Sequence, residues 1–403
     1  GAQAVNAGLD MDMGTGIYTA TLQQAVESGK VTVEVIDEAV RRILSVKMWL
    51  GLFEHPYIQE AEMHRYDVLP EDHLALALRA AEKSIVLLKN SDDLLPLDPG
   101  KRVALVGTLA DKPEEVVGAW ALNWKMEDCV SIRTGMEQAF SNMEYFPCGG
   151  PEGELNQDEV KAAGEYGDVI VAVLGETTAM SGEAASRSDI TLPGQQQKLL
   201  AQLLETGKPV VLVLMNGRPL ALQWENEHIP AIVEAWHLGI QMGHAVANIL
   251  SGKAAPEGKL SSSFPAVTGQ CPVYYNHPST GRPASGSKFT SKYLDAPLDS
   301  LYPFGHGLSY TRFSLSDLQV EENQGTLTIS AAVENVGSRT GTETVQLYVQ
   351  DVSATLVRPV KELKDFEKVR LASGEKTEIR FELSKKDMGF FDNQRNYRLE
   401  DGL

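Results

Sequence analysis

The sequence has few cysteines and no long hydrophobic run. Its three cysteines, Cys129, Cys148 and Cys271, allow at most one disulfide bridge and form no Cys-x-x-Cys pair. They therefore indicate neither a disulfide scaffold nor a zinc or thiol redox motif. The longest apolar runs, Val169–Leu174 and Val210–Met215, are far shorter than the roughly 20 residues that a membrane-spanning helix needs. We therefore expect no membrane-spanning helix, and the acidic net charge of −19 disfavours an anionic membrane as a partner.

Positive charge is also in deficit. Lysine and arginine total 36 against 55 for aspartate and glutamate, which gives a formal net charge of −19 over 403 residues. Such a surface repels phosphate backbones, so we expect no nucleic-acid partner. With 43% hydrophobic and 23% charged residues, the chain has the composition of folded protein, and its length suggests two or three domains.

Several catalytic and cofactor motifs are absent. Gly207-Lys208 is followed by proline and lacks the upstream glycine of a phosphate loop, and neither Gly-x-Gly-x-x-Gly nor Gly-x-Ser-x-Gly occurs. His237 and His244 are seven residues apart, but no carboxylate pattern joins them into a zinc site. The sequence therefore predicts no metal and no cofactor, and it disfavours a generic nucleotide-binding protein.

The first 71 residues resemble part of a larger unit. We predict a buried strand over Leu9–Met13 and a helix over Val33–Val46 with Thr32 as its cap. Residues 1–53 are too short to enclose a core, and 54–71 are typical of a linker because they hold two prolines and several acids. Because the chain begins and ends within such patterns, we expect it to be a fragment of a longer polypeptide.

Residues 72–265 alternate between helical and strand patterns. A helix is predicted from Glu71 to Lys89, and further helices near 157–165, 194–206 and 241–251. The predicted strands are Arg102–Val106, Asp168–Leu174, Pro209–Met215 and Ile229–Ala235. Continuous apolar strands that alternate with helices indicate an α/β domain with a largely parallel sheet.

The remaining residues change pattern twice. Residues 266–310 have no periodicity and form a long loop region. From 311 to 403 the sequence alternates with period two, which predicts a β-sandwich of the immunoglobulin or fibronectin kind. Four apolar residues are expected to be buried there: Leu347, Val349, Phe366 and Phe381.

Two segments of the α/β domain could carry chemistry. Gly175–Asp189 follows a predicted buried strand and holds Glu176, Glu183 and Arg187, and ligands gather at the carboxyl ends of such strands. The alternative is a solvated acidic loop. Trp120 and Trp124 could stack against a sugar ring, or they could be ordinary core residues.

The order of short motifs resembles glycoside hydrolase family 3, and in particular its bacterial periplasmic β-glucosidases. These motifs extend over nearly the whole chain: AGLDMDM (7–13), SIVLLKN (84–90), GE (175–176), NGRP (216–219), GKL (258–260), SFP (263–265), CPVYYNH (271–277), TGRP (280–283), YPFGHGLSY (302–310) and RPVKEL (358–363). The resemblance implies the tail of a TIM-like barrel, an α/β sandwich and a truncated fibronectin-III-like domain.

The resemblance also implies roles for individual residues. In the family the nucleophile is an aspartate in a Ser-Asp-Trp stretch of the barrel, and no such stretch occurs here, so we assign no nucleophile to this chain. The general acid/base is a glutamate of the second domain. Its spacing to Arg187 favours Glu183, with Glu176 as the second and more structural candidate. Trp120, Trp124 and Arg187 would contact substrate.

The function implied is retaining, exo-acting hydrolysis of terminal β-D-glucosyl residues from a β-glucoside or oligosaccharide. The fragment alone is expected to be inactive without the missing barrel. By the same resemblance the location is periplasmic or secreted, and a homodimer is possible, although no sequence feature decides this. The alternative is a non-catalytic carbohydrate-binding or scaffold module.

Overall fold

The computed structural model of the protein describes residues 1–63, 67–150 and 153–400, and the chain divides into two units, Gly1–Glu71 and Asp72–Leu403. Residues 64–66 of the predicted linker, 151–152 of the predicted α/β domain and 401–403 of the predicted third domain lie outside the described residues. Within the described ranges, no helix is both long and apolar enough to cross a bilayer.

The first unit is helical and has a small apolar core. Its helices are α1 (Ala2–Asn6), α2 (Ile17–Glu27), α3 (Val33–Trp49) and α4 (Glu60–Met63). Val5, Ala25 and Val31 are buried together where the helices meet. Helix α3 covers the predicted helix and continues three residues beyond Val46.

The predicted strand over Leu9–Met13 is wrong. The Asp12 carboxylate accepts hydrogen bonds from the Thr15 hydroxyl at 2.5 Å and from the Tyr18 amide at 3.0 Å, which folds the segment into a turn ahead of α2. Leu9 and Met13 are exposed. The apolar alternation predicted a strand, but within the first unit the described residues provide no neighbouring strand to pair with it.

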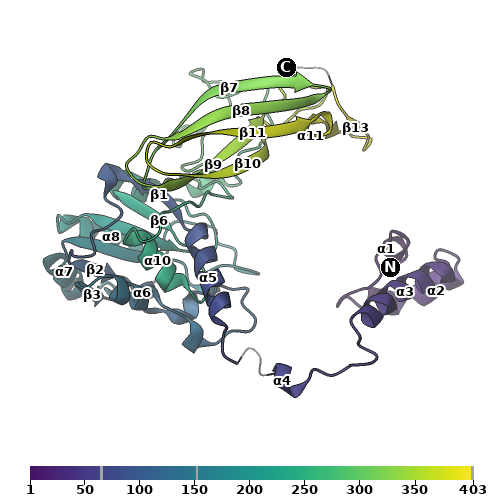
Figure 1. The fold of residues 1–403 in the computed structure, drawn as a ribbon, viewed down its shortest axis with the longest axis horizontal. Helices are drawn as coiled ribbons and strands as arrows, with labels where there is room; N and C mark the ends of the chain where they lie inside the picture. Colours follow the sequence, from purple (N-terminus) through teal and green to yellow (C-terminus); the bar gives the residue numbers. More distant parts are fainter. Residues whose placement is uncertain (64–66, 151–152, 401–403) are drawn as a thin grey trace. The chain divides into compact units, whose positions relative to one another are not determined.

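A mixed sheet forms the centre of the α/β part of the second unit (Figure 1). Its order is β1-β6-β5-β4-β2-β3, and every neighbouring pair is parallel except β1 and β6. The strands are β1 (Val86–Asn90), β2 (Val103–Val106), β3 (Met143–Phe146), β4 (Val169–Gly175), β5 (Val210–Met215) and β6 (Ala231–Glu234). This confirms the predicted α/β class with a largely parallel sheet.

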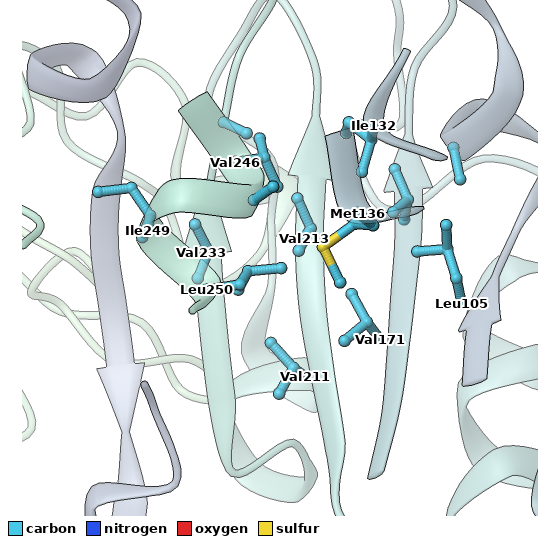
Figure 2. Close-up of a cluster of buried hydrophobic side chains, with 14 of the residues drawn as sticks. Leu105, Ile132, Met136, Val171, Val211, Val213, Val233, Val246, Ile249 and Leu250 are labelled. Atoms are coloured by element: carbon cyan, nitrogen blue, oxygen red, sulfur yellow. The ribbon is translucent and has the colours of Figure 1, made fainter. Parts of the chain in front are cut away.

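Helices cover both faces of this sheet because its strands are apolar on both faces. One face packs against α5 (Glu71–Ser84), α6 (Ile132–Ala139) and α10 (Met242–Leu250), as Figure 2 shows for the side chains of Val211, Val213, Met136 and Val246. The other face packs against α7 (Gln157–Tyr166), α8 (Gln196–Glu205) and the segment at α9 (Gln223–His228). Neighbouring residues of one strand therefore enter different cores.

The predicted helix over Glu71–Lys89 is wrong in its last five residues. Helix α5 ends at Ser84, and Val86–Asn90 is the edge strand β1, which pairs antiparallel with β6. Val86 and Leu88 enter one apolar cluster, whereas Ile85 and Leu87 enter the other. A continuous apolar run is compatible with a helix or with a doubly buried strand, and the free edge of β6 selects the strand.

The second part of this unit is a β-sandwich, as predicted. One sheet has the order β11-β8-β7, and β9 pairs with β10 in the other. The bounds are β7 (Phe313–Asn323), β8 (Thr326–Asn335), β9 (Gly341–Val349), β10 (Glu362–Leu371), β11 (Lys376–Ser384), α11 (Lys385–Met388), β12 (Phe390–Phe391) and β13 (Tyr397–Arg398). Residues from both sheets, including Val333, Leu371 and Phe381, form its core.

One residue expected in that core is outside it. Phe366 is 57% exposed, whereas Phe381 is buried and Leu347 and Val349 pack against the cluster. Val369 and Leu371 face inward on β10, so the period of two places Phe366 on the opposite face. There it lines a groove of about 660 Å³ between the sandwich and the α/β domain.

The region 266–310 contains a single short 3-10 helix, Thr268–Gln270, among its described elements, and its last residues attach to the sheet domain. The Tyr302 hydroxyl donates to Asn226 Oδ1 at 2.8 Å, and the Tyr310 hydroxyl donates to the Ile249 carbonyl at 2.8 Å. These bonds connect the α/β domain to the start of the sandwich.

Candidate active site

Three neighbouring strands end at the same edge of the sheet. Strands β4, β5 and β6 end at Gly175, Met215 and Glu234, and they are adjacent and parallel. Crevices outside such strand ends are the usual ligand sites of α/β sheets. The segment after β4 is Glu176–Asp189, called here the β4 loop.

The last residue of β4 fixes the start of this loop. The Gln196 side chain accepts a hydrogen bond from the Gly175 amide at 2.7 Å and donates one to the Gly175 carbonyl at 2.8 Å. Gly175 has φ 140°, and a Cβ there would lie 2.0 Å from the Met215 carbonyl oxygen. A glycine is therefore required where the end of β4 lies against the Met215 carbonyl of β5.

Glu176 is fully buried and both of its oxygens are bound. Oε1 accepts from Arg187 Nη1 at 2.6 Å, and Oε2 accepts from Arg218 Nε at 3.1 Å. A buried carboxylate with two charge-assisted bonds is expensive to disrupt, because losing it leaves the arginines uncompensated. The geometry therefore suits a structural role for Glu176, which was the second candidate for the acid/base.

The two arginines also fold the β4 loop. Arg218 donates to the carbonyls of Ala185, at 2.8 Å, and Met180, and these two residues lie on either side of Glu183. Arg187 was predicted to bind substrate, but its guanidinium is bound to Glu176 and its side chain is 22% exposed. The structure therefore places Arg187 inside the loop's own ion-pair network.

Glu183 lies in different surroundings on the same loop. It is exposed and follows Gly182, whose φ is 97°, and precedes Ala184, whose φ is 60°. Within residues 1–63, 67–150 and 153–400, its carboxylate has no hydrogen bond or ion pair. Positive-φ residues on both sides of Glu183 thus place it in a turn where its side chain is exposed to solvent.

The structure brings the β4 loop next to Trp120. A Cβ on Gly182 would lie 2.8 Å from the Ala119 Cβ and 3.7 Å from Trp120 Nε1. Trp120 is 69% exposed and Trp124 is 37% exposed, so neither is an ordinary core residue. An exposed indole beside an exposed carboxylate suits the apolar face and the oxygen atoms of a sugar.

Sequence reasoning missed the polar residues behind the loop. Asn216 and Glu234 are fully buried at the ends of β5 and β6, and Asn216 Nδ2 donates to Glu234 Oε2 at 3.1 Å. Burial raises the pKa of Glu234 to about 8. The NGRP motif contains Asn216 and Arg218 and was a signal for this site, whereas Glu234 lies at the end of an apolar strand without any motif of its own.

A second set of contacts reaches the loop from the other side. His237 Nδ1 bonds the Glu115 carbonyl at 2.8 Å, and Glu115 Oε2 accepts from the Thr178 amide at 2.6 Å. Burial lowers the pKa of His237. This histidine is therefore a neutral hydrogen-bonding group, in contact with backbone, at neutral pH.

No group of three or more histidine, cysteine, aspartate or glutamate side chains with metal-binding geometry occurs in the described part of the chain. His244 Nδ1 lies 2.7 Å from Gln241 Oε1, and the two spaced histidines thus have separate polar partners. The chemistry that this edge of the sheet offers comes from its carboxylates, arginines and indoles.

Comparison with known proteins identifies the same two domains. The model of the glycosyl hydrolase family 3 C-terminal domain matches residues 85–310, and that of a fibronectin type III-like domain matches 343–403. The chain is 39% identical over 435 residues to the periplasmic beta-glucosidase of Salmonella typhimurium, covering 99% of this chain and 57% of that protein. It is 34% identical over 403 residues to a beta-xylosidase of Formosa agariphila, covering 94% of this chain and 55% of that protein.

A solved structure agrees with these matches. The beta-glucosidase from Listeria innocua in complex with isofagomine matches with a TM-score of 0.91 and 39% identity, covering 99% of this chain and 57% of that chain. This chain thus spans a little over half the length of these relatives. The family match covers more than half of the chain and confirms the resemblance drawn from its motifs: the chain belongs to glycosyl hydrolase family 3.

Proposed function

We propose that this chain supplies the acid/base half of a retaining, exo-acting β-glucosidase that hydrolyses terminal β-D-glucosyl residues. In such a reaction one carboxylate attacks the anomeric carbon while a carboxylic acid protonates the departing oxygen, and the same acid then deprotonates water. Glu183 has the second of these roles. The nucleophilic aspartate is contributed by a barrel outside these 403 residues.

The observation that carries this proposal is the contrast between two glutamates on one loop. An acid/base must reach the glycosidic oxygen and exchange a proton twice in each turnover. Glu176 is buried and bound to two arginines, whereas Glu183 is exposed and unpaired among the described residues, on the loop that touches Trp120. Trp120 and Trp124 would stack against the sugar.

The first unit supports the presence of a barrel. On α3, Val33, Val40 and Leu44 are 54%, 46% and 43% exposed and lie on one side of the helix, which leaves an apolar helix face uncovered within the unit. Such a face is typical of a helix that packs against a larger body. In our proposal residues 1–53 are the last part of a TIM-like barrel.

The same proposal fixes the remaining boundaries. Residues 54–71 link the barrel to the α/β domain at 72–265, residues 266–310 connect that domain to the next, and residues 311–403 are a fibronectin-III-like domain. The Salmonella relative is named as periplasmic, which supports a periplasmic or secreted location.

The direct test compares two proteins with 4-nitrophenyl β-D-glucoside: this chain alone, and this chain joined to the barrel encoded upstream of it. We expect turnover only from the second protein, because the chain alone lacks the nucleophile. Turnover by the chain alone would refute the assignment of the nucleophile. Absence of turnover by both would favour the non-catalytic carbohydrate-binding module.

In the joined protein, Glu183→Gln should lower kcat by about 10²–10⁴-fold on a glucoside with a poor leaving group, which depends on protonation. Glu205→Gln, which changes an exposed glutamate at the end of α8, is the matched control and should have full activity. On 4-nitrophenyl β-D-glucoside, whose good leaving group needs little protonation, azide should restore turnover to Glu183→Ala and give a β-glucosyl azide, because the small anion attacks the glycosyl-enzyme without a general base. If Glu183→Gln is fully active, the role belongs to another residue.

The sugar specificity needs its own comparison because one relative is named a beta-xylosidase. We expect the joined protein to prefer the glucoside when 4-nitrophenyl β-D-glucoside and β-D-xyloside are compared by kcat/KM. A preference for the xyloside would keep the mechanism and change the substrate.

A further inference from the structure

Glu234 occupies an unusual position for an acidic residue. It is the last residue of β6 and is 0% exposed. Its Oε1 accepts from the Trp236 amide at 2.8 Å and its Oε2 accepts from Asn216 Nδ2 at 3.1 Å. A buried carboxyl group is costly unless both oxygens are bonded, so these two contacts fix its orientation.

One arm of contacts runs from Glu234 through Asn216 to the β4 loop. Asn216 Nδ2 also donates to the Arg218 carbonyl at 2.8 Å, which sets the path of the backbone at Arg218. The Arg218 guanidinium then binds Glu176 at 3.1 Å and the Ala185 carbonyl at 2.8 Å. This arm therefore holds the loop at two places that flank Glu183.

A second arm runs from Glu234 through the Trp236 amide. Trp236 has φ 52°, a left-handed conformation that is unfavourable for a bulky side chain and needs support from its surroundings. The hydrogen bond to Glu234 supplies that support. The turn places His237 against the Glu115 carbonyl, and Glu115 Oε2 binds the Thr178 amide of the loop at 2.6 Å.

We infer that Glu234 is a positioning residue: from behind the sheet edge it joins the two arms that hold the β4 loop, and with it Glu183, in place. This inference rests on the proposed function for the role of Glu183, but the holding of the loop does not. Glu234 acts through Asn216 and Trp236 and does not itself contact substrate.

The protonation state of Glu234 gives the inference a specific pH signature. Because burial raises its pKa to about 8, the carboxyl group is uncharged at pH 7 and acquires its charge above pH 8. Ionisation then adds a negative charge next to the Glu176 carboxylate. The other charged or titratable groups of the two arms are Arg187, Arg218, Glu115 and His237. The new charge repels the Glu176 carboxylate, which anchors Arg187 and Arg218, and this repulsion loosens the loop.

Hydrogen–deuterium exchange of this chain tests the inference without any activity. Glu234→Gln keeps the length of the side chain, but it leaves only one acceptor oxygen for two donors, the Trp236 amide and Asn216 Nδ2. We expect the amides of Glu176–Asp189 to exchange at least tenfold faster at pH 7 in this variant, with the other strands of the sheet unchanged. The matched control is Glu225→Gln, because Glu225 is 2% exposed and burial raises its pKa too, yet it lies on α9.

The pH series separates positioning from ordinary core stability. After correction for intrinsic exchange, loop exchange in the unaltered chain should rise with a midpoint near pH 8, and this step should be absent from Glu234→Gln. Unchanged loop exchange in Glu234→Gln would overturn the inference, and so would an equal acceleration across the whole domain. If Glu234→Gln does not fold, Asn216→Ala cuts the first arm alone and decides by the same readout.

The activity of the joined protein distinguishes a failure of the proposed function from a failure of this inference. If Glu234→Gln loosens the loop while Glu183→Gln is fully active in the joined protein, the proposed function fails and the positioning role stands.

Discussion

At the scale of single residues, the surroundings of two glutamates seven positions apart decide what each can do. Glu176 directly follows a buried strand, so its side chain is enclosed and must be neutralised by Arg187 and Arg218. Glu183 lies in a turn of the same loop, between two positive-φ residues, and is exposed. One carboxylate therefore holds the loop, and the other is exposed and, in our proposal, transfers the proton.

This contrast predicts that substitutions of the two glutamates change the stability of the fold to very different extents. Glu176→Gln should lower the free energy of unfolding by about 3–5 kcal/mol, because it leaves two mostly buried arginines without their counter-charge. Glu183→Gln should change it by less than about 0.5 kcal/mol, as for an ordinary surface substitution. Denaturant titration followed by circular dichroism measures both. Equal losses of stability in the two variants would mean that the ion-pair network is not specific to Glu176.

The buried Glu234 predicts a dependence of stability on pH. Its pKa is about 8 in the folded chain against an ordinary value of 4.5, so the folded state holds a proton that the unfolded state releases between these pH values. The stabilisation from this proton is fully present below pH 4.5 and is lost as the pH rises through 8. Relative to Glu234→Gln, the unaltered chain should lose on the order of 1 kcal/mol per pH unit in that window. Parallel stability curves of the two proteins from pH 5 to 8 would contradict this.

At the scale of elements, the ends of the strands matter more than their interiors. Strand β4 can be read from its continuous apolar run, but its function depends on the close approach of Gly175 to the Met215 carbonyl. This approach aligns the ends of β4 and β5, and with them Glu176 and Asn216. A side chain at this glycine would separate the two strands.

Gly175→Ala should therefore destabilise the domain severely. The new Cβ would lie 2.0 Å from a backbone oxygen, in addition to the strain of φ 140°. The control is Gly207→Ala, where φ is 74° and no atom lies within 4 Å of the Cβ, so backbone strain of about 1 kcal/mol is the whole penalty. We expect Gly175→Ala to lose at least about 2 kcal/mol more than the control in thermal or denaturant unfolding. Equal losses would show that the strands separate without penalty.

At the scale of the second unit, specific polar contacts join the sandwich to the α/β domain. Lys259 Nζ donates to the Gly307 carbonyl at 2.7 Å and pairs with Glu343 of β9 at 2.6 Å, and both side chains are about four-fifths buried. Gln346 Nε2 donates to the Gly305 carbonyl at 3.0 Å. The end of the 266–310 region thus binds both domains.

Lys259→Ala should weaken this coupling. Removing the Lys259 ammonium leaves the Glu343 carboxylate and the Gly307 carbonyl without their hydrogen-bond donor. The free energy of unfolding should fall by about 1–3 kcal/mol. Lys376→Ala is the matched control, since its pair with Asp317 is exposed and contributes about 0–1 kcal/mol. Calorimetry should show a lower or split transition for Lys259→Ala alone. Identical traces for the two variants would mean that the domains are held together by apolar contacts.

The sequence alone predicted the α/β class, four of the six strands of the central sheet and the sandwich, because these depend on local periodicity. It did not predict that Val86–Lys89 belong to an edge strand instead of the helix, since that choice depends on the unpaired edge of β6. It wrongly placed Phe366 in the core. Which face of β10 points inward depends on how this strand packs in the sandwich, and the alternating pattern alone does not contain that information. For the strand predicted over Leu9–Met13, the local turn at Asp12 prevailed over the apolar pattern.

The sequence by itself determined the family and the list of polar residues on the β4 loop, because motif order and strand patterns depend only on residues that are close together in the sequence. Only the tertiary structure decided how those residues differ. Burial, the two arginines on Glu176 and the link from Glu234 through Asn216 all join residues from separate strands. Such contacts arise when parallel strands end side by side, and no local pattern contains them.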